Sequence, residues 1–290
     1  MISFRYHIVS LTAVFLAIGL GFVLGSAIQP TNRATRSSIS RLTRELNGTR
    51  AQISDLRTQV QGSSSVVKNL SSRVIHGALA GHPVVYVDDG SASSWEGGVR
   101  KAMSDATATD LGTLTLTSKW TDTNANSDLV TIAAAAGVKV GSERAGPDVL
   151  AALADRFGKP EGVQLAGQLA QAGYVRIDNK GAAGPWPPAV AVAVVAFTSG
   201  ATTPQAAALA AFASEAGKAT PTAVVGAALD NLGAVGLLRG NGNLPAHLVT
   251  FDSGAADPTS VGPVLALGAA IDGRGGNFGN GPGLSYLPPV

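Results

Sequence analysis

Three aspartates are the residues of this chain whose types and spacing point most directly to chemistry. Asp88 and Asp89 follow the apolar stretch Pro83–Val87, and Asp252 follows Leu248–Phe251. If these stretches form parallel strands, the acids lie at the carboxyl ends, where open α/β sheets bind ligands. Paired carboxylates there can hold Mg²⁺. The alternative is a tight turn, because an Asp-Gly step suits a turn without any ligand. We favour the turn, and we assign no catalytic and no metal-ligating residue.

Other reactive side chains are scarce. The 290 residues include no cysteine, two methionines and four histidines. Disulfides, thiolate metal sites and cysteine nucleophiles are therefore excluded, and a soft metal finds few ligands. His76 and His82 are expected at the surface, because their spacing across Gly77 does not put them on one helical face. There is no P-loop, GxSxG elbow or HExxH motif. The sequence thus predicts a protein without a cofactor that is not an enzyme, with an α/β enzyme as the less favoured alternative.

The segments that would position the aspartates alternate between strands and helices. The expected strands are 83–87, 112–117, 174–177, 189–197, 222–225 and 248–251. The expected helices are 93–103, 146–157, 163–172, 204–216 and 263–271. Such alternation predicts an α/β head domain with a mostly parallel sheet over residues 78–272. The Gly/Asn/Pro-rich tail, residues 273–290, has no core-forming period, so we expect a surface loop or a flexible end.

An apolar segment without charge, Ile8–Ile28, lies near the beginning of the chain. Its 21 residues would form a helix of about 31 Å, which matches a hydrocarbon core of about 30 Å. Residues 1–30 are therefore predicted to be a single transmembrane helix in the lipid bilayer. A cleaved signal peptide is the alternative, with Gly25–Ala27 as its cleavage site. The predicted anchor residues are Leu11, Phe15, Leu16, Ile18, Leu20, Phe22 and Leu24.

Apolar residues then recur at alternating spacings of three and four positions. The pattern predicts a coiled-coil stalk over residues 31–77. The part of this stalk that carries heptads would be about 54 Å long at the rise of an α-helix. β-Branched residues at most a positions, with Leu at d, favour two parallel strands and hence a parallel homodimer. An amphipathic helix that packs on its own domain is the alternative. The predicted dimer interface consists of Ile39, Leu42, Leu46, Ile53, Leu56, Val60, Val67, Leu70 and Val74.

Charge is divided unevenly along the chain. Residues 1–77 carry nine Lys and Arg against two acids, a net +7, and residues 78–290 carry twelve against seventeen, a net −5. The mildly acidic head is not expected to bind nucleic acid, whereas the basic stalk can meet anionic lipid or an acidic partner. The positive-inside rule, applied to the four arginines between 33 and 44, would leave the head in the cytoplasm.

Three stretches of the sequence resemble a known family. They are residues 1–26 (MISFRYHIVSLTAVFLAIGLGFVLGS), Arg73–Gly81 (RVIHGALAG) after the heptads, and the C-terminal part with helix 264–271 and Gly279-x-Gly281-x-Gly283. Their order is similar to the actinobacterial copper transporter family, the MctB-like group that is also described as SteB-like. The resemblance implies copper efflux or homeostasis in the cell envelope. As an alternative, it implies a partnership with a membrane protein that controls septal cell-wall hydrolysis and cell separation.

The resemblance and the residues differ on two points. The family's head domain lies outside the cytoplasmic membrane, against the charge count, and here we follow the family. Copper transport would call for thiolate or thioether ligands for Cu(I), which this chain nearly lacks. An anchor, a coil and a ligand-poor head instead predict a scaffold or regulator with a membrane protein as its partner.

Overall fold

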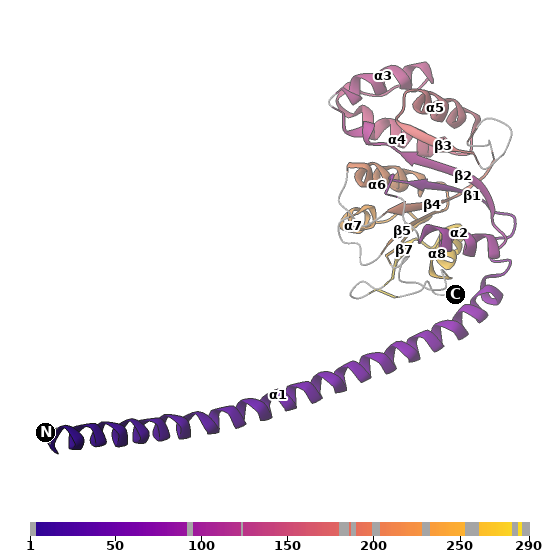
Figure 1. Cartoon of the computed structure of the whole chain (residues 1–290). Coiled ribbons are helices and arrows are strands. Elements are labelled where there is room, and N and C mark those ends of the chain that lie inside the picture. The colour runs from indigo at the N-terminus through magenta and orange to yellow at the C-terminus, as the bar shows by residue number, and fades with distance from the viewer. Residues whose placement is uncertain are drawn as a thin grey trace. The chain divides into compact units, whose positions relative to one another are not determined.

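The computed structural model in Figure 1 describes residues 4–91, 95–122, 124–179, 186, 190–198, 204–227, 233–252, 261–279 and 284–285. Within helix α1 (Phe4–Ile75), the described side chains are those of residues 9–25, 39, 41–43, 45–56 and 73–75. The chain divides into two compact units, Met1–Ser63 and Ser64–Val290. The first unit is formed by α1, and the second contains the end of α1 and the head domain.

The head is built on one sheet of seven described strands in the order β3-β2-β1-β4-β5-β6-β7. Every pair is parallel except β2–β3, which is antiparallel. This arrangement confirms the predicted α/β class with a mostly parallel sheet. The strands are β1 (Pro83–Asp88), β2 (Thr109–Leu116), β3 (Val175–Asp178), β4 (Ala193–Thr198), β5 (Thr222–Gly226), β6 (Leu248–Phe251) and β7 (Gly276–Phe278).

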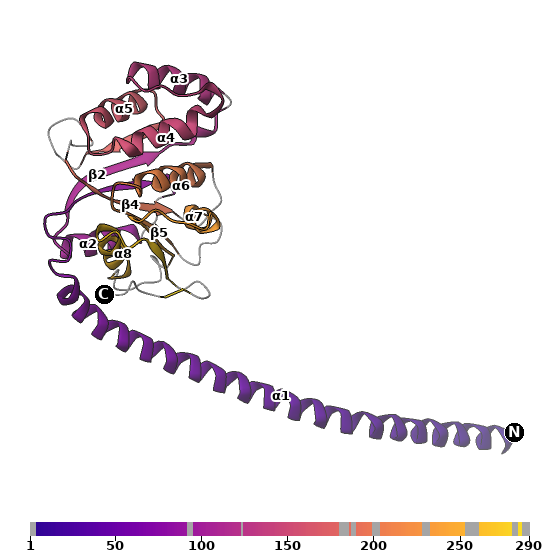
Figure 2. The same ribbon diagram turned by 180° about the vertical axis from the view of Figure 1, so that it is seen from behind.

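Helices cover both faces of the sheet, as Figures 1 and 2 show from opposite sides. Strand β1 explains why: Val84 and Tyr86 pack into the cluster under α2 and α8, while Val85 and Val87 pack into the cluster under α4 and α6. Side chains alternate along a strand, so a strand buried on both faces is apolar throughout. The helices of the head are α2 (Glu96–Asp105), α3 (Ala125–Ala135), α4 (Ala145–Asp155), α5 (Pro160–Gln171), α6 (Pro204–Ala216), α7 (Ala234–Gly240) and α8 (Val261–Ile271), with 3₁₀ turns η1 (Ser118–Thr121) and η2 (Ser142–Arg144).

The end of α1 is tied to the head by the segment that carries the family resemblance. Ile75 and Leu79 are buried in the cluster with Met103 of α2. The backbone N–H of Leu79 donates to the carbonyl of Ala106, at 3.0 Å. Residues 73–81 therefore form a packed junction that leads into β1.

Two predictions on the head are corrected. The tail, residues 273–290, was expected to be a surface loop or a flexible end, but Gly276–Phe278 form β7 beside β6. Its glycines reflect close packing, since a Cβ at Gly275 or Gly279 would meet the Pro245 carbonyl or the Asp252 carboxylate. Strand β4 begins at Ala193 instead of residue 189: its first pairs are Ala193 with Val84 of β1 and Val194 with Thr222 of β5.

Helix α1 runs without a break from Phe4 to Ile75, across the predicted border between anchor and stalk. Among the residues that the structure describes, no helix meets the length and hydropathy needed to cross a membrane. The predicted transmembrane helix over residues 1–30 is therefore not confirmed by the structure.

Candidate functional site

The sheet has one switch point, between β1 and β4, where its connections leave in opposite directions. From β1 the chain passes through α2 to β2 on one side, and from β4 it passes through α6 to β5 on the other. In open α/β sheets the crevice beyond the strand carboxyl ends at such a point is where ligands bind. The last residues of the two strands, Asp88 and Thr198, mark this place.

Asp88 and Asp89 form the predicted turn at the switch point. Asp88 Oδ1 accepts the Gly90 N–H at 2.8 Å, and its Oδ2 accepts the Thr115 hydroxyl at 3.0 Å. Asp89 Oδ1 accepts the Ser91 N–H at 3.0 Å and also the Ser91 hydroxyl. Both carboxylates are only 5% exposed. The turn is thus confirmed, and it holds two buried carboxylates side by side in the sequence.

The electrostatics of this turn are unfavourable for an anion. Burial raises the pKa of the Asp88 carboxyl, and the charge of Asp89 acts in the same direction. Hydrogen bonds from Gly90 and Thr115 and the charge of Arg100 oppose that shift in the pKa. A glycine-rich first turn would cradle a phosphate at the helix N-terminus, but the adjacent carboxylates of Asp88 and Asp89 make this turn unsuitable for a phosphate.

The third predicted acid, Asp252, does not join the pair. It follows β6, and β4 and β5 lie between β6 and β1. Its side chain is 1% exposed, and Oδ2 accepts from Arg239 Nη1 at 2.7 Å. Arg239 also donates to the Thr250 hydroxyl at 3.1 Å and to the Phe278 carbonyl at 2.8 Å. This buried ion pair holds α7, β6 and β7 together.

Arg100 is a charged residue of the candidate site that the sequence analysis did not identify. Its guanidinium carbon lies 3.9 Å from the centre of the Tyr86 ring, and Nη2 donates to Thr113 Oγ1 at 2.9 Å. Nη1 lies 3.9 Å from Asp110 Oδ2. Burial, and then the charge of Asp110, raises the pKa of Tyr86. Arg100 therefore supplies a partly buried positive charge between α2 and the sheet, and a lone Arg in a helix gives no signal of such a role.

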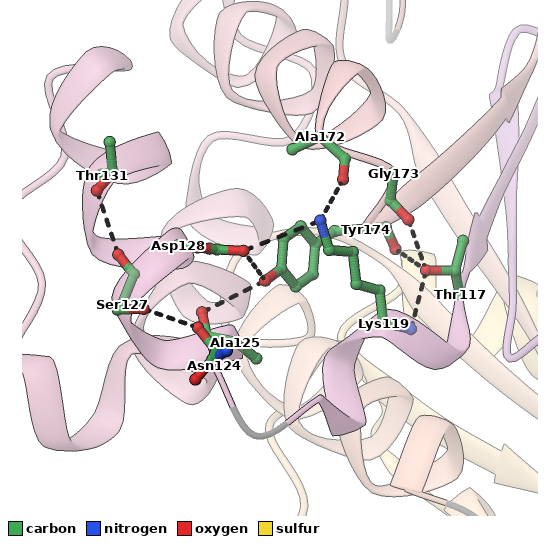
Figure 3. Close-up of polar contacts among 10 residues, drawn as sticks. All are labelled: Thr117, Lys119, Asn124, Ala125, Ser127, Asp128, Thr131, Ala172, Gly173 and Tyr174. Carbon is green, nitrogen blue, oxygen red and sulfur yellow. Dashed lines mark hydrogen bonds and ion pairs between the residues drawn. The ribbon is translucent and has the colours of Figure 1, made fainter.

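A second polar cluster lies at the carboxyl end of β2 (Figure 3). Lys119 Nζ donates to the Ala172 carbonyl at 2.9 Å, and lies 3.9 Å from Asp128 Oδ2 and 4.8 Å from the centre of the Tyr174 ring. The Tyr174 hydroxyl is 3.4 Å from both the Ala125 carbonyl oxygen and Asp128 Oδ2. Burial, followed by the charge of Asp128, raises the pKa of Tyr174. These contacts connect η1 to α3 and to the segment before β3, which is the arrangement of a structural clamp.

An open cleft of about 440 Å³ lies between α4, α6 and α7. Alanine is the commonest residue of its lining, and Arg144, Asp148 and Glu215 are its charged groups. Asp148 Oδ2 accepts the Gly141 N–H at 3.4 Å, and Glu215 is paired with Lys218 at 2.6 Å. With two of three charges engaged inside the chain, the cleft has little with which to orient a ligand.

No group of three or more His, Asp or Glu side chains that could hold a metal ion occurs among the described residues. His76 is exposed and His82 is partly exposed, in agreement with their expected surface positions.

The residues predicted to face a partner helix or lipid all lie on α1. The described interface residues Ile39, Leu42, Leu46, Ile53 and Leu56 are 45% to 59% exposed, and Val74 is 67% exposed. The side chains of Val60, Val67 and Leu70 lie outside the described residues. The predicted anchor residues Leu11, Phe15, Leu16, Ile18, Leu20, Phe22 and Leu24 are 55% to 79% exposed.

Fold and site together define a class of protein: a long N-terminal helix joined to a doubly wound α/β head whose switch point carries carboxylates. The chain belongs to the family described as "Copper transport outer membrane protein, MctB", which it matches over residues 1–289. It is similar to the "Copper transporter MctB" of Mycobacterium tuberculosis (strains CDC 1551 / Oshkosh and ATCC 25618 / H37Rv) and of Mycobacterium bovis. Each is 26% identical to this chain, over 98% of both lengths. The family resemblance in the sequence is confirmed, and the family's name is consistent with the predicted envelope location.

Proposed function

We propose that the protein is a membrane-anchored, dimeric scaffold of the cell envelope that acts in copper homeostasis and is not an enzyme. The observation that carries the proposal is helix α1, 72 residues long, whose large apolar side chains are exposed in both its anchor and its heptad part. A helix that is apolar on all sides needs an apolar surrounding, and one with an apolar stripe needs a second helix. The two parts of α1 therefore call for lipid and for a partner chain.

The anchor part is supported by where its exposed residues lie. At 3.6 residues per turn, the exposed side chains of Phe15, Leu16, Ile18 and Leu24 point to four different sides of the helix. Leaving a Leu or Phe side chain in water costs about 1.5–3 kcal/mol relative to burying it. A lipid environment around residues 8–28 would remove this cost for all sides at once, whereas packing against one protein surface would remove it for only one side.

The dimer is supported by the contacts along the stripe. Thr49, a polar residue at a d position, donates its hydroxyl to the Glu45 carbonyl at 2.9 Å. It can therefore enter a coiled-coil seam without an unpaired hydroxyl. Glu45 also accepts from Arg41 Nε at 3.1 Å on the helix surface. Glu45 occupies a g position of the heptad, at the edge of the apolar stripe. An acid at g can pair with a basic residue at the following e position of the partner helix.

The role in copper homeostasis rests on the names of the relatives, and the residues suggest that it is indirect. Oxygen and imidazole are nearly the only ligands that this chain offers, whereas Cu(I) prefers sulfur. We therefore infer that the dimer positions a membrane-protein partner, and that copper tolerance depends on that partner.

Complementation of a null strain tests the proposal. Deleting Ile39–Val74 should abolish complementation, because it removes the coil while the anchor and head remain. Copper tolerance and the length of cell chains are measured together. A change in chain length with normal copper tolerance would favour the alternative role in cell separation, and full complementation by the deletion variant would refute the scaffold.

The extracytoplasmic position of the head is tested separately by cysteine labelling. Because the chain has no native cysteine, an introduced cysteine is the only thiol that can react. Asn243 lies exposed after α7. An Asn243→Cys variant in intact cells should react with a membrane-impermeant maleimide, and the wild type serves as the blank. Labelling only after lysis would place the head in the cytoplasm, as the arginine count alone predicts.

A further inference from the structure

Within the described part of the chain, one carboxylate oxygen at the switch point has no hydrogen-bond partner. Asp89 is 5% exposed, and its Oδ1 is engaged by Ser91, but Oδ2 is buried without a hydrogen bond among the described residues. A buried carboxylate oxygen left unpaired is costly. Native structures pair more than nine in ten of their buried polar groups, so each exception needs an explanation, and a bound ion is one.

The charge around Oδ2 decides which kind of ligand it takes. Asp88, the preceding residue, is equally buried, and the charge of Asp89 acts on its carboxyl group. The nearest basic side chain of α2, Arg100, is directed to Thr113, Asp110 and the ring of Tyr86. Two adjacent carboxylates with one open oxygen attract a cation and repel an anion.

We propose that Asp89, together with Asp88, binds one hard divalent cation, Mg²⁺ or Ca²⁺, at the switch point between β1 and β4. Oxygen ligands select hard cations over Cu(I). Two carboxylates suffice for Mg²⁺, which retains several water ligands and is usually held by one or two carboxylates. The location agrees with the rule that open α/β sheets bind ligands beyond the carboxyl ends of the strands at a switch point.

A bound cation would neutralise the carboxylates of Asp88 and Asp89 and fix the conformation of the turn at residues 88–91. The site is thus distinct from copper transport: it belongs to the head, contains no sulfur and is independent of the coil. Failure of the dimer proposal would leave it untouched.

Manganese(II) serves as the probe, because its electron paramagnetic resonance signal falls when the ion is bound. The full chain, purified in detergent and freed of metal with a chelator, should bind one Mn²⁺ that Mg²⁺ or Ca²⁺ displaces. Asp89→Asn should weaken binding at least tenfold. The matched control is Asp272→Asn, which removes an exposed carboxylate paired with Arg274 and should bind Mn²⁺ like the wild type.

Thermal unfolding of the wild-type chain provides a second measurement, for which no variant is needed. Mg²⁺ should raise the unfolding temperature of the wild-type chain, since a ligand that binds only the folded state stabilises it. The same shift should be absent in Asp89→Asn. The proposal is overturned if the wild type binds no Mn²⁺ at millimolar concentration, if Asp89→Asn binds it as the wild type does, or if Cu(I) displaces it.

Discussion

The buried carboxylates of the head differ in what compensates their charge. Asp252 is paired with a guanidinium, and Asp88 accepts an N–H and a hydroxyl. Asp89 leaves one oxygen open. Substitutions at these places therefore act through different mechanisms: loss of a counter-charge, loss of a turn, or loss of a ligand.

Replacing Arg239 should be among the most destabilising substitutions in the head. Arg239→Met leaves the Asp252 carboxylate, 1% exposed, without its counter-charge, and breaking a buried pair in this way costs about 3–5 kcal/mol. Chemical denaturation of the purified chain measures the loss.

The exposed pair Arg274–Asp272 provides the control for Arg239. Arg274→Met should change the free energy of unfolding by less than about 1 kcal/mol, because exposed ion pairs contribute little. A loss for Arg239→Met as small as that expected for Arg274→Met would mean that the Arg239 pair is not important to the fold.

Tyr174 should make the stability of the head sensitive to alkaline pH. Because burial raises its pKa, the folded state retains a proton that the unfolded chain releases near pH 10. Stability is therefore lost as pH rises above about 10. Tyr174→Phe has no proton to release, so it should lose less stability than the wild type between pH 9 and 11. Denaturation midpoints at several pH values give the two slopes, and equal slopes would contradict the assignment.

At the scale of elements, the sequence predicts those whose ends coincide with changes in apolar pattern. Helix α6 (Pro204–Ala216) and strand β6 (Leu248–Phe251) begin and end where the pattern does. Helix α3 was missed because its alanine-rich sequence has little apolar asymmetry. Strand β7 was missed because it depends on backbone pairing with β6 and on glycines that allow close approach, and neither leaves an apolar alternation.

The candidate site was predictable only in part, for the same reason. The sequence places Asp88 and Asp252 at strand ends, as the structure does. It could not separate their roles, because the partner of Asp252 comes from α7, a short helix without a recognisable pattern. The open oxygen of Asp89 and the charge of Arg100 depend on tertiary packing, which spacing along the chain does not encode.

The heptad stripe on α1 predicts the effect of charges on assembly. Leu46→Asp with Ile53→Asp should dissociate the dimer, because each would bury an unpaired carboxylate in the seam. Ala51→Asp, at the exposed f position of the same helix, is the matched control and should leave the dimer intact. Sedimentation of residues 31–290 at micromolar concentration measures this. A wild-type monomer under these conditions would refute the coil.

At the scale of the whole molecule, the proposed scaffold function determines which properties of the stalk are needed. If it only joins two chains and sets how far from the membrane the head can act, its length and its pairing matter but its sequence does not. A chain of the same number of residues without helical structure would supply neither a fixed length nor a partner.

Exchange of the stalk therefore tests the function of the molecule as a unit. Replacing residues 39–74 by an unrelated parallel two-stranded coiled coil of equal length should preserve complementation. A Gly/Ser linker of equal residue number should abolish it, since a flexible chain has no fixed reach. Removing two heptads keeps the seam in register but shortens the helix by about 21 Å, so intermediate or lost copper tolerance would show that reach is required. If the linker variant complements fully, the stalk is only a tether, and the activity must be sought in the head and its cation site.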